Sequence, residues 1–280
     1  MTNSHKVIDS HQHFWKLDRG DYNWLDKSFG ILYQDYNPAD LKPYLGAANV
    51  EQTILVQAAQ TIEETEFMLS LADRNEFIGG VVGWVDLEAE SVITDIARLA
   101  RHSKLKGVRP MIQDIEDHQW IANAKLSPAI DALVHHNLRF DALVTTQHID
   151  SLIVMMNRHP SLPVVIDHGA KPPIKSGNLN VWRQKIRDIS SHQNVYCKLS
   201  GLLTECGENP SVQEITPVFE HLMTCFGPDR LIWGSDWPVV RLRAEYGDWL
   251  SMTNDLISEL PAMSQRKIMS SNAKHFYGLN

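Results

Sequence analysis

The sequence predicts an α/β protein built as a single-domain (β/α)8 TIM barrel, because eight short apolar segments alternate with helical segments along 280 residues. The apolar segments are nearly continuous and rich in β-branched residues, as expected of parallel strands buried on both faces. One such barrel uses roughly 250 residues. No linker-like segment divides the chain, so residues 1–280 are expected to form one domain.

The elements follow one another in a regular order. Strands are expected at 7–13, 52–57, 80–85, 105–110, 138–144, 163–168, 194–200 and 230–236. Helices are expected to begin at Pro38 and at Thr61, the second with a capping-box pattern, and to lie near 91–101, 127–136, 147–158, 180–191, 211–225, 245–259 and 264–276. Eight strands favour a closed barrel over an open doubly wound sheet. The sequence also lacks G-x-G-x-x-G after the first strand and a P-loop motif, which leaves nucleotide chemistry without support.

The segment after the first strand, residues 14–38, is unusually aromatic for a loop. It holds seven of the 23 aromatic residues of the chain, interleaved with Asp, Gly and Asn. We expect a long first βα loop folded over the barrel mouth, where aromatic rings wall a pocket. The alternative is a plug that only seals the barrel.

The net charge of the chain limits the kinds of molecule that the protein is expected to bind. Lys and Arg total 26 against 34 for Asp and Glu, and the net charge of −8 offers no basic surface for nucleic acid or anionic lipid. The polar start of the chain indicates neither a signal peptide nor a membrane span. Three cysteines without a Cys-x-x-Cys pair suit a reducing cytoplasm. We therefore expect a cytoplasmic monomer or homodimer that acts on a small molecule.

Polar side chains gather at the predicted C-terminal ends of the strands, where barrels carry their chemistry. His11 and His13 end the first strand at an i, i+2 spacing that places both imidazoles on one face. His168 ends the sixth strand and Asp236 the eighth. Each residue alone could be part of the framework, and Asp236 could merely cap a turn. Together they form a cluster that can hold one zinc-like ion or activate one water.

Other strand ends and loops supply further candidates. Arg109 ends the fourth strand, where a guanidinium can clamp a carboxylate or steady an oxyanion, or simply form a salt bridge. Proline-stiffened loops are expected to hold Lys171 and Trp237 in place. The residues around Ser200 and Ser235 lack the G-x-S-x-G frame of a nucleophile elbow, which favours water as the nucleophile.

Five ordered blocks resemble the amidohydrolase superfamily, and within it the branch of sugar lactonases and pyrone-dicarboxylate lactonases, especially L-fuconolactonase-like members. The blocks are Ile8–Trp15, Lys106–Arg109, Ile166–Pro172, Cys197–Gly201 and Ile232–Pro238. The resemblance runs nearly end to end and implies the barrel fold and a hydrolase activity.

The resemblance also implies roles for individual residues. His11, His13, His168 and Asp236 match the metal-binding and water-activating set, with Asp236 as the general base, and Arg109 matches a substrate-contacting arginine. Members with two metals carry a bridging lysine or glutamate at the end of the fourth strand, where this chain has Arg109. We therefore expect at most one divalent ion, most simply zinc. The branch also includes members that work without metal, which leaves open whether an ion is bound.

These observations predict a hydrolase that opens a sugar lactone, an aldonolactone such as L-fucono- or L-rhamnonolactone, by attack of a water activated by Asp236. His168 and Arg109 are expected to stabilise the oxyanion. The residues expected to bind substrate are Trp15, Gln57, Trp84, Lys171 and Trp237. The alternatives are a metal-dependent decarboxylase of an aromatic acid, a pyrone-dicarboxylate lactonase, and a barrel that binds a sugar acid without turnover.

Overall fold

The computed structural model describes residues 6–279, and within them eight parallel strands lie in the order of the chain. They are β1 (Val7–Gln12), β2 (Val50–Val56), β3 (Ile78–Gly83), β4 (Leu105–Val108), β5 (Arg139–Ala142), β6 (Val164–Ile166), β7 (Val195–Leu199) and β8 (Leu231–Trp233). The predicted (β/α)8 barrel is confirmed. The predicted domain limits, residues 1 and 280, lie outside the described residues.

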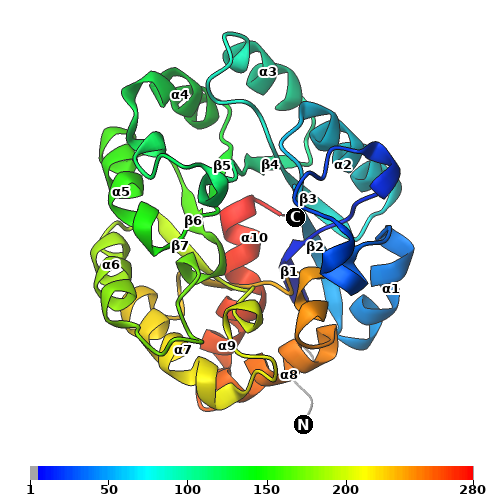
Figure 1. The fold of residues 1–280 in the computed structure, drawn as a ribbon, viewed down its shortest axis with the longest axis vertical. Coiled ribbons are helices and arrows are strands. Elements are labelled where there is room, and N and C mark those ends of the chain that lie inside the picture. Colours follow the sequence, from blue (N-terminus) through cyan, green and yellow to red (C-terminus); the bar gives the residue numbers. More distant parts are fainter. Residues whose placement is uncertain (1–5, 280) are drawn as a thin grey trace.

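Helices surround the strands on the outside of the barrel (Figure 1). They are α1 (Pro38–Ala47), α2 (Ile62–Arg74), α3 (Val92–Leu99), α4 (Ser127–His135), α5 (Ile149–Arg158), α6 (Asn180–Ser190), α7 (Val212–Phe226) and α8 (Tyr246–Ile257). Each lies where the sequence predicts one. Within residues 6–279, no helix is long and apolar enough to cross a membrane.

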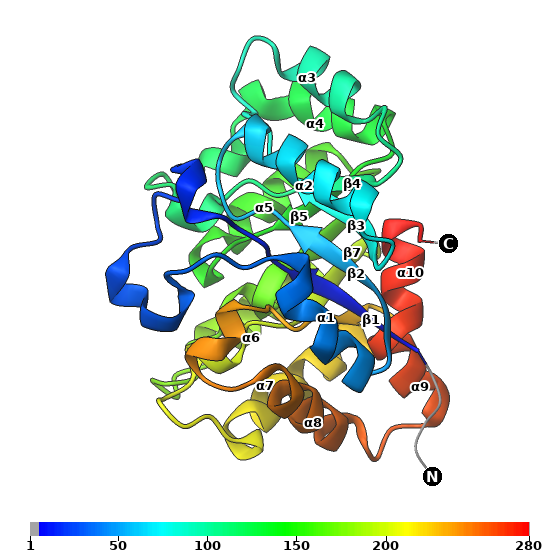
Figure 2. The same cartoon turned by 90° about the vertical axis from the view of Figure 1, so that its right-hand side faces the viewer.

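The C-terminal helices close one end of the barrel. The predicted last helix is divided into α9 (Ala262–Arg266), a π-helical turn (Lys267–Ser271) and α10 (Asn272–Tyr277). Figure 2 shows α10 at the end of the barrel opposite the loop that follows β1. Ala273, Phe276 and Tyr277 pack there against apolar residues of the strands such as Ile8 and Ile232. This end is therefore filled, and the site has to lie at the other end.

Hydrogen bonds join the first and last strands and close the barrel. The amide of His13 donates to the carbonyl of Trp237 at 2.7 Å, and the amide of Asp236 donates to the carbonyl of His11 at 2.8 Å. The carboxylate of Asp9 accepts from the amide of Ser235 at 2.8 Å. Burial raises the pKa of Asp9 to about 6. This closure brings the end of β1 directly beside the residues that follow β8.

The aromatic loop after β1 folds back on itself beside the mouth of the barrel. Trp15 and Tyr36 pair as an isolated antiparallel bridge. The indole of Trp24 donates to the carbonyl of Ala58 at 2.7 Å, which ties the loop to the segment after β2. The loop is therefore packed structure rather than a loose cover.

The capping box predicted at the start of α2 forms only in part. The hydroxyl of Thr61 accepts from the amide of Glu64, as predicted. The Glu64 carboxylate instead accepts from the amides of Ala58 and Ala59, and burial raises its pKa to about 8. Tertiary contacts thus take over the second half of the motif, and Glu64 fixes the loop that carries Ala58.

Candidate active site

The four residues predicted to form one cluster do meet at the open end of the barrel. One carboxylate oxygen of Asp236, Oδ1, lies 3.3 Å from Nε2 of His13 and 3.6 Å from Nε2 of His11. The same oxygen lies 4.0 Å from Nε2 of His168. The two β1 imidazoles are 3.2 Å apart through their Nε2 atoms. One carboxylate therefore faces three imidazoles.

Hydrogen bonds behind the rings orient two of these imidazoles. Nδ1 of His13 donates to the carbonyl of Val56 at 2.8 Å. Because a carbonyl can only accept, this bond places a proton on Nδ1 and turns Nε2 toward Asp236. Nδ1 of His168 lies 2.9 Å from the Ser200 hydroxyl. Both rings thus present Nε2 to the cluster.

His168 stands on a left-handed turn. Four successive residues, 168–171, have φ between 51° and 59°, a conformation that costs L-residues roughly 1–2 kcal/mol each. The amide of Lys171 donates to the carbonyl of His168, and the indole of Trp182 donates to the carbonyl of Gly169 at 2.7 Å. The turn directs both His168 and Lys171 to the same cavity. Strain of this kind is typical of functional sites.

The electrostatics of the cluster favour a charged Asp236 and a neutral His168. Burial alone would raise the pKa of Asp236, but His168, His13 and His11 outweigh it and hold that pKa below its usual range. Burial lowers the pKa of His168 to about 4, although Asp236 and Asp167 act in the opposite direction. At neutral pH the carboxylate is thus available as a base.

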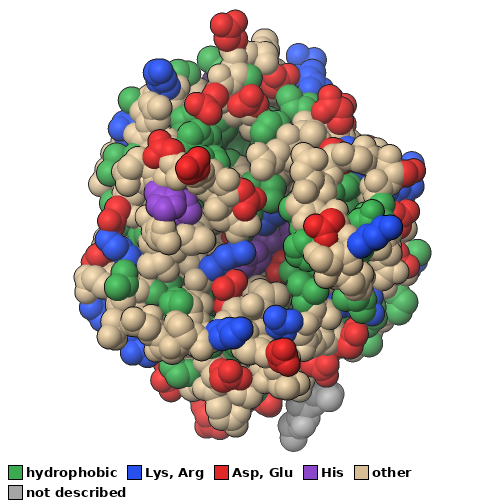
Figure 3. Space-filling view, in the orientation of Figure 1, with side chains coloured by type: hydrophobic (Ala, Val, Ile, Leu, Met, Phe, Trp, Pro, Cys, Tyr) green, Lys and Arg blue, Asp and Glu red, His purple; other side chains and the backbone are tan. Residues whose placement is uncertain are grey.

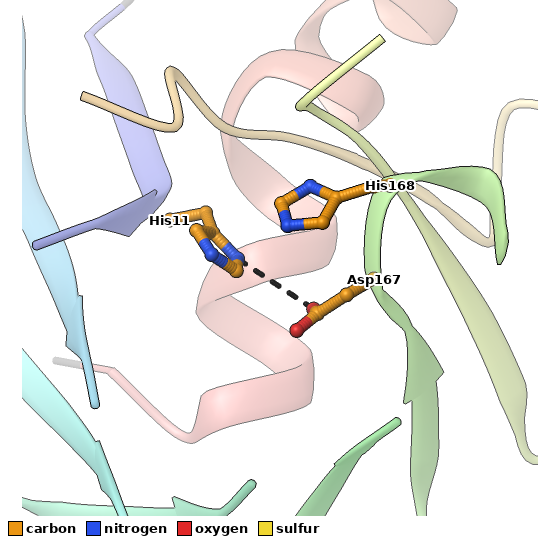
Figure 4. Close-up of side chains that lie close together, drawn as sticks. All are labelled: His11, Asp167 and His168. Atoms are coloured by element: carbon orange, nitrogen blue, oxygen red, sulfur yellow. Dashed lines mark ion pairs between the residues drawn. The ribbon is translucent and has the colours of Figure 1, made fainter. Parts of the chain in front are cut away.

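A second group of polar residues lies beneath this cluster, and the sequence did not predict its role. Oδ1 of Asp167 lies 3.5 Å from Nδ1 of His11 (Figure 4). The amine of Lys198 lies 3.1 Å from the same Asp167 oxygen and 2.5 Å from Oδ2 of Asp141. Burial would raise the pKa of Asp167, but Lys198, His11 and Arg109 hold it well below its ordinary value. Asp167 and Lys198 lie at predicted ends of strands, and this position is the one feature of the sequence that could have identified them.

Arg109 lines the cavity, but the protein already occupies most of its hydrogen-bond donors. Its Nε donates to the side chain of Gln57 at 2.9 Å, and Nη2 donates to the Gln57 carbonyl. Nη1 lies 3.4 Å from Asp167 and 3.4 Å from Nε2 of His11. Arg109 therefore supplies positive charge from a fixed position.

A cavity of about 330 Å³ opens above the cluster. Figure 3 shows the hollow near the middle of this face, with histidine at its floor. Its wall combines rings and aliphatic groups with a few polar side chains; it is lined by His13, Trp15, Trp24, Phe29, Ala58, Arg109, Met111, Gln113, Asp114, Leu143, His168, Lys171, Thr204, Asp236 and Val239. Such a mixture suits a small, mostly uncharged ligand.

The structure separates the five predicted substrate-binding residues into two groups. Trp15 and Lys171 line the cavity, whereas Gln57, Trp84 and Trp237 lie outside the lining described for residues 6–279. Gln57 instead holds Arg109. Trp237 packs edge-on against Phe14 and Tyr36, and the Trp84 backbone is bonded to Thr65.

Asp114 and Thr204 line the cavity although the sequence did not indicate them as substrate-binding residues. Asp114 follows β4 in a short 3-10 turn, and Thr204 follows β7 in another. Gln113 also faces the cavity, and its buried amide oxygen has no hydrogen-bond partner within residues 6–279. Such turns have no hydrophobic period, so only their position after a strand could have indicated them.

The residues present fit one divalent metal ion. His11, His13 and Asp236 offer ligand atoms that all lie within 4.8 Å of one another. A tetrahedral ion with bonds of about 2.0–2.1 Å holds its ligand atoms roughly 3.4 Å apart. The observed separations of 3.2, 3.3 and 3.6 Å match that spacing. Nε2 of His13, which faces Asp236, is the nitrogen that would bind such an ion.

The sequence matches the family described as Amidohydrolase over residues 8–279. It is 43% identical to an L-fucono-1,5-lactonase of Burkholderia ambifaria over 98% of this chain and 96% of the relative. It is 33% identical to an L-fucono-1,5-lactonase of Burkholderia multivorans, over 97% of this chain and 96% of that one. The resemblance noted from the five sequence blocks is confirmed.

The fold also matches a solved structure closely. The crystal structure of an amidohydrolase from Burkholderia multivorans with bound zinc superposes with a TM-score of 0.93 at 33% sequence identity. The superposition covers 99% of this chain and 100% of that chain.

The close approach of Gly201 to His168 gives a test of how tightly this site is packed. A Cβ atom at Gly201, where φ is +60°, would lie 2.4 Å from Nδ1 of His168. Gly201→Ala is therefore expected to lower the free energy of unfolding by about 2–4 kcal/mol, from backbone strain and overpacking together. Equilibrium urea unfolding measures the change.

Two other glycines serve as matched controls. Gly177 also has a positive φ, but a Cβ there would meet nothing within 4 Å, so Gly177→Ala isolates the strain at about 1 kcal/mol. Gly207 has neither feature, and Gly207→Ala should change stability by less than about 0.5 kcal/mol. Equal losses at Gly201 and Gly177 would contradict the packing of His168 against Gly201.

Proposed function

The chain belongs to the Amidohydrolase family, and on that basis we propose that it is a hydrolase that opens a sugar lactone. We propose an aldonolactone of five or six carbons, such as L-fucono- or L-rhamnonolactone, as the substrate. The reaction class predicted from the sequence is confirmed by the nearly full-length similarity to L-fucono-1,5-lactonases. The observation in the structure that supports it best is the buried Asp236 carboxylate, which faces three imidazoles at the floor of a partly apolar cavity.

In the proposed mechanism, Asp236 takes a proton from a water as that water attacks the lactone carbonyl. A low pKa keeps the carboxylate charged, and the surrounding imidazoles orient both the base and the water. The proton then passes from Asp236 to the ring oxygen as the acyl–oxygen bond breaks. A lactone has an alkoxide leaving group, so this route needs a positioned water, a base and an oxyanion donor.

Hydrogen-bond donors and positive charge around the cavity are proposed to stabilise the oxyanion. His168 and Arg109 were predicted for this role, and both line the cavity. Lys171 is the more available cation, because its amine makes no hydrogen bond or ion pair with any of residues 6–279, unlike the guanidinium of Arg109. We propose that Lys171 joins His168 and Arg109 around the carbonyl oxygen.

A divalent ion is proposed to bind in the same cluster, with at most one ion per chain. Zinc suits the donor set, in which His11, His13 and His168 supply nitrogen and Asp236 supplies a carboxylate oxygen. When bound, it would supply Lewis acidity and lower the pKa of a water. The roles proposed for Asp236 and Lys171 follow from the positions of their side chains and do not require the ion.

The cavity favours a sugar lactone over pyrone dicarboxylate. Its lining holds two cations, Arg109 and Lys171, and also two acids, Asp114 and Asp236. Arg241 adds no further cation to this lining, since it pairs with Glu245 and donates to the Tyr36 hydroxyl. Rings and aliphatic groups can instead hold the apolar face and methyl group of a deoxy sugar.

The proposed compartment and oligomeric state are those expected from the sequence. We propose that the enzyme works in the cytoplasm as a monomer or homodimer. Three free cysteines, Cys197, Cys206 and Cys225, suit that compartment. The proposal involves neither nucleic acid nor membrane.

Replacement of the proposed base tests the mechanism. Asp236→Asn keeps the shape of the side chain but removes its ability to accept a proton, so kcat should fall by at least 10²-fold. The rate is measured with a pH indicator, and circular dichroism confirms that the fold is intact. Asp131→Asn, on the exposed side of α4, is the matched control and should retain activity. Turnover of a folded Asp236→Asn variant within threefold of wild type would exclude Asp236 as the base.

Competing substrates test the proposed class. L-Fuconolactone and L-rhamnonolactone should each give a kcat/KM at least tenfold above that of 2-pyrone-4,6-dicarboxylate at equal concentration. A methyl group is worth only roughly 1–3 kcal/mol of discrimination, so several related lactones should be accepted. The rate of spontaneous ring opening is measured in parallel with the Asp236→Asn variant and is subtracted from each rate. A tenfold preference for the dicarboxylate, or release of carbon dioxide from an aromatic acid, would favour the rival reactions.

A further inference from the structure

A lysine is completely buried inside the barrel, beneath the residues proposed to react. Lys198 lies on β7, and its side chain is fully shielded from solvent. Its amine is 2.5 Å from Oδ2 of Asp141, 3.1 Å from Oδ1 of Asp167 and 3.1 Å from Nδ1 of His11. Burying an amine is expensive unless it is paired in this way. The proposed reaction makes no use of Lys198 as a chemical group.

The atoms around this amine are those that bind a divalent ion. Two carboxylate oxygens and one imidazole nitrogen converge on one point from β5, from the turn that follows β6 and from β1. Zinc takes these ligand types at 2.0–2.2 Å, so the side chains would have to move inward by about 1 Å or less to hold an ion where the amine lies. The position of the amine is therefore close to that of a metal ion.

The Asp141 carboxylate has few partners besides Lys198. Oδ2 of Asp141 accepts one further hydrogen bond, from the Tyr277 hydroxyl of α10 at 2.7 Å. Oδ1 of Asp141 has no hydrogen-bond partner within residues 6–279. Tyr277 is neutral at ordinary pH, since burial raises its pKa well above the usual value. Lys198 is thus the close cation that balances Asp141.

We propose that Lys198 is a built-in cation that fills a second, latent metal cage behind His11, so that the barrel accepts one divalent ion at most. The ion on the cavity side would meet Nε2 of His11, whereas Lys198 occupies the side of Nδ1. In this role Lys198 is a positioning residue, because it fixes His11 and neutralises the carboxylates without reaching the cavity. The inference concerns charge and metal binding, and it holds whichever lactone is opened.

Removing the amine should expose the latent cage. In a Lys198→Ala variant, Asp141 and Asp167 lose their shared counter-charge, and the space of the side chain becomes free. The full-length protein is stripped with a chelator, equilibrated with zinc at a fixed free concentration and analysed for metal by elemental analysis. Wild type should hold no more than one zinc per chain, and Lys198→Ala should hold one more than wild type.

Two controls separate this effect from a general change in the protein. Lys106→Ala removes a half-buried lysine of β4 whose amine donates to the Gly278 carbonyl, and it should leave the zinc count unchanged. Lys198→Ala combined with Asp141→Asn removes one ligand of the cage, and the additional ion should be lost. A purely structural role for Lys198 would move stability but not the number of ions.

A variant that folds poorly still gives an answer. If Lys198→Ala unfolds in chelator, zinc should raise its melting temperature more than that of Lys106→Ala. Lys198→Met combined with Asp141→Asn should be more stable than Lys198→Met alone, because the charges are removed together. A folded Lys198→Ala protein with the zinc count of wild type would overturn the inference, as would two ions in wild type or a double variant no more stable than the single one. If the zinc counts are as expected but the wild-type protein opens no lactone, only the proposed reaction is contradicted.

Discussion

The site depends on the balance of charges that are buried inside the barrel. Three carboxylates, of Asp141, Asp167 and Asp236, lie in the interior with almost no exposure to water. Such groups stay charged only where cations and hydrogen-bond donors surround them. Lys198 and Arg109 supply that charge beneath and beside the cluster, while imidazoles surround Asp236. The same balance leaves one carboxylate, Asp236, facing the cavity and able to accept a proton.

The scaffold maintains this balance at both ends of the barrel. At the closed end, Tyr277 of α10 donates to Asp141, so the terminal helix contacts the polar interior as well as the apolar core. At the open end, the aromatic loop supplies Trp15, Trp24 and Phe29 as walls of the cavity. Apolar walls of this kind are expected to exclude water from the carbonyl of a bound lactone, which would strengthen the electric fields of the charges below. The loop therefore does more than seal the barrel.

The sequence was sufficient to predict the barrel, since strands buried on both faces and the order of the helices leave clear apolar patterns. It also predicted the meeting of His11, His13, His168 and Asp236, because strand ends converge at one edge of a barrel. The left-handed turn at residues 168–171 could not be predicted, since only one of its residues is glycine and tertiary contacts hold it. Nor could the sequence show that the side chains of Gln57 and Asp167 bind Arg109. It also could not show that the Glu64 carboxylate accepts from the amides after β2 and does not complete the capping box.

In the proposed reaction Asp236 activates a water and is not itself the nucleophile. A single turnover with enzyme in excess, run in water enriched in oxygen-18, separates water attack on the lactone from a covalent route in which water opens an acyl–Asp236 anhydride at the aspartyl carbon. The label is located by mass spectrometry of the product and the protein. We expect one labelled oxygen in the carboxylate of the opened sugar acid, none in its new hydroxyl group and none in the protein. An unlabelled product together with labelled Asp236 would show that the carboxylate attacked the lactone, and would contradict the account.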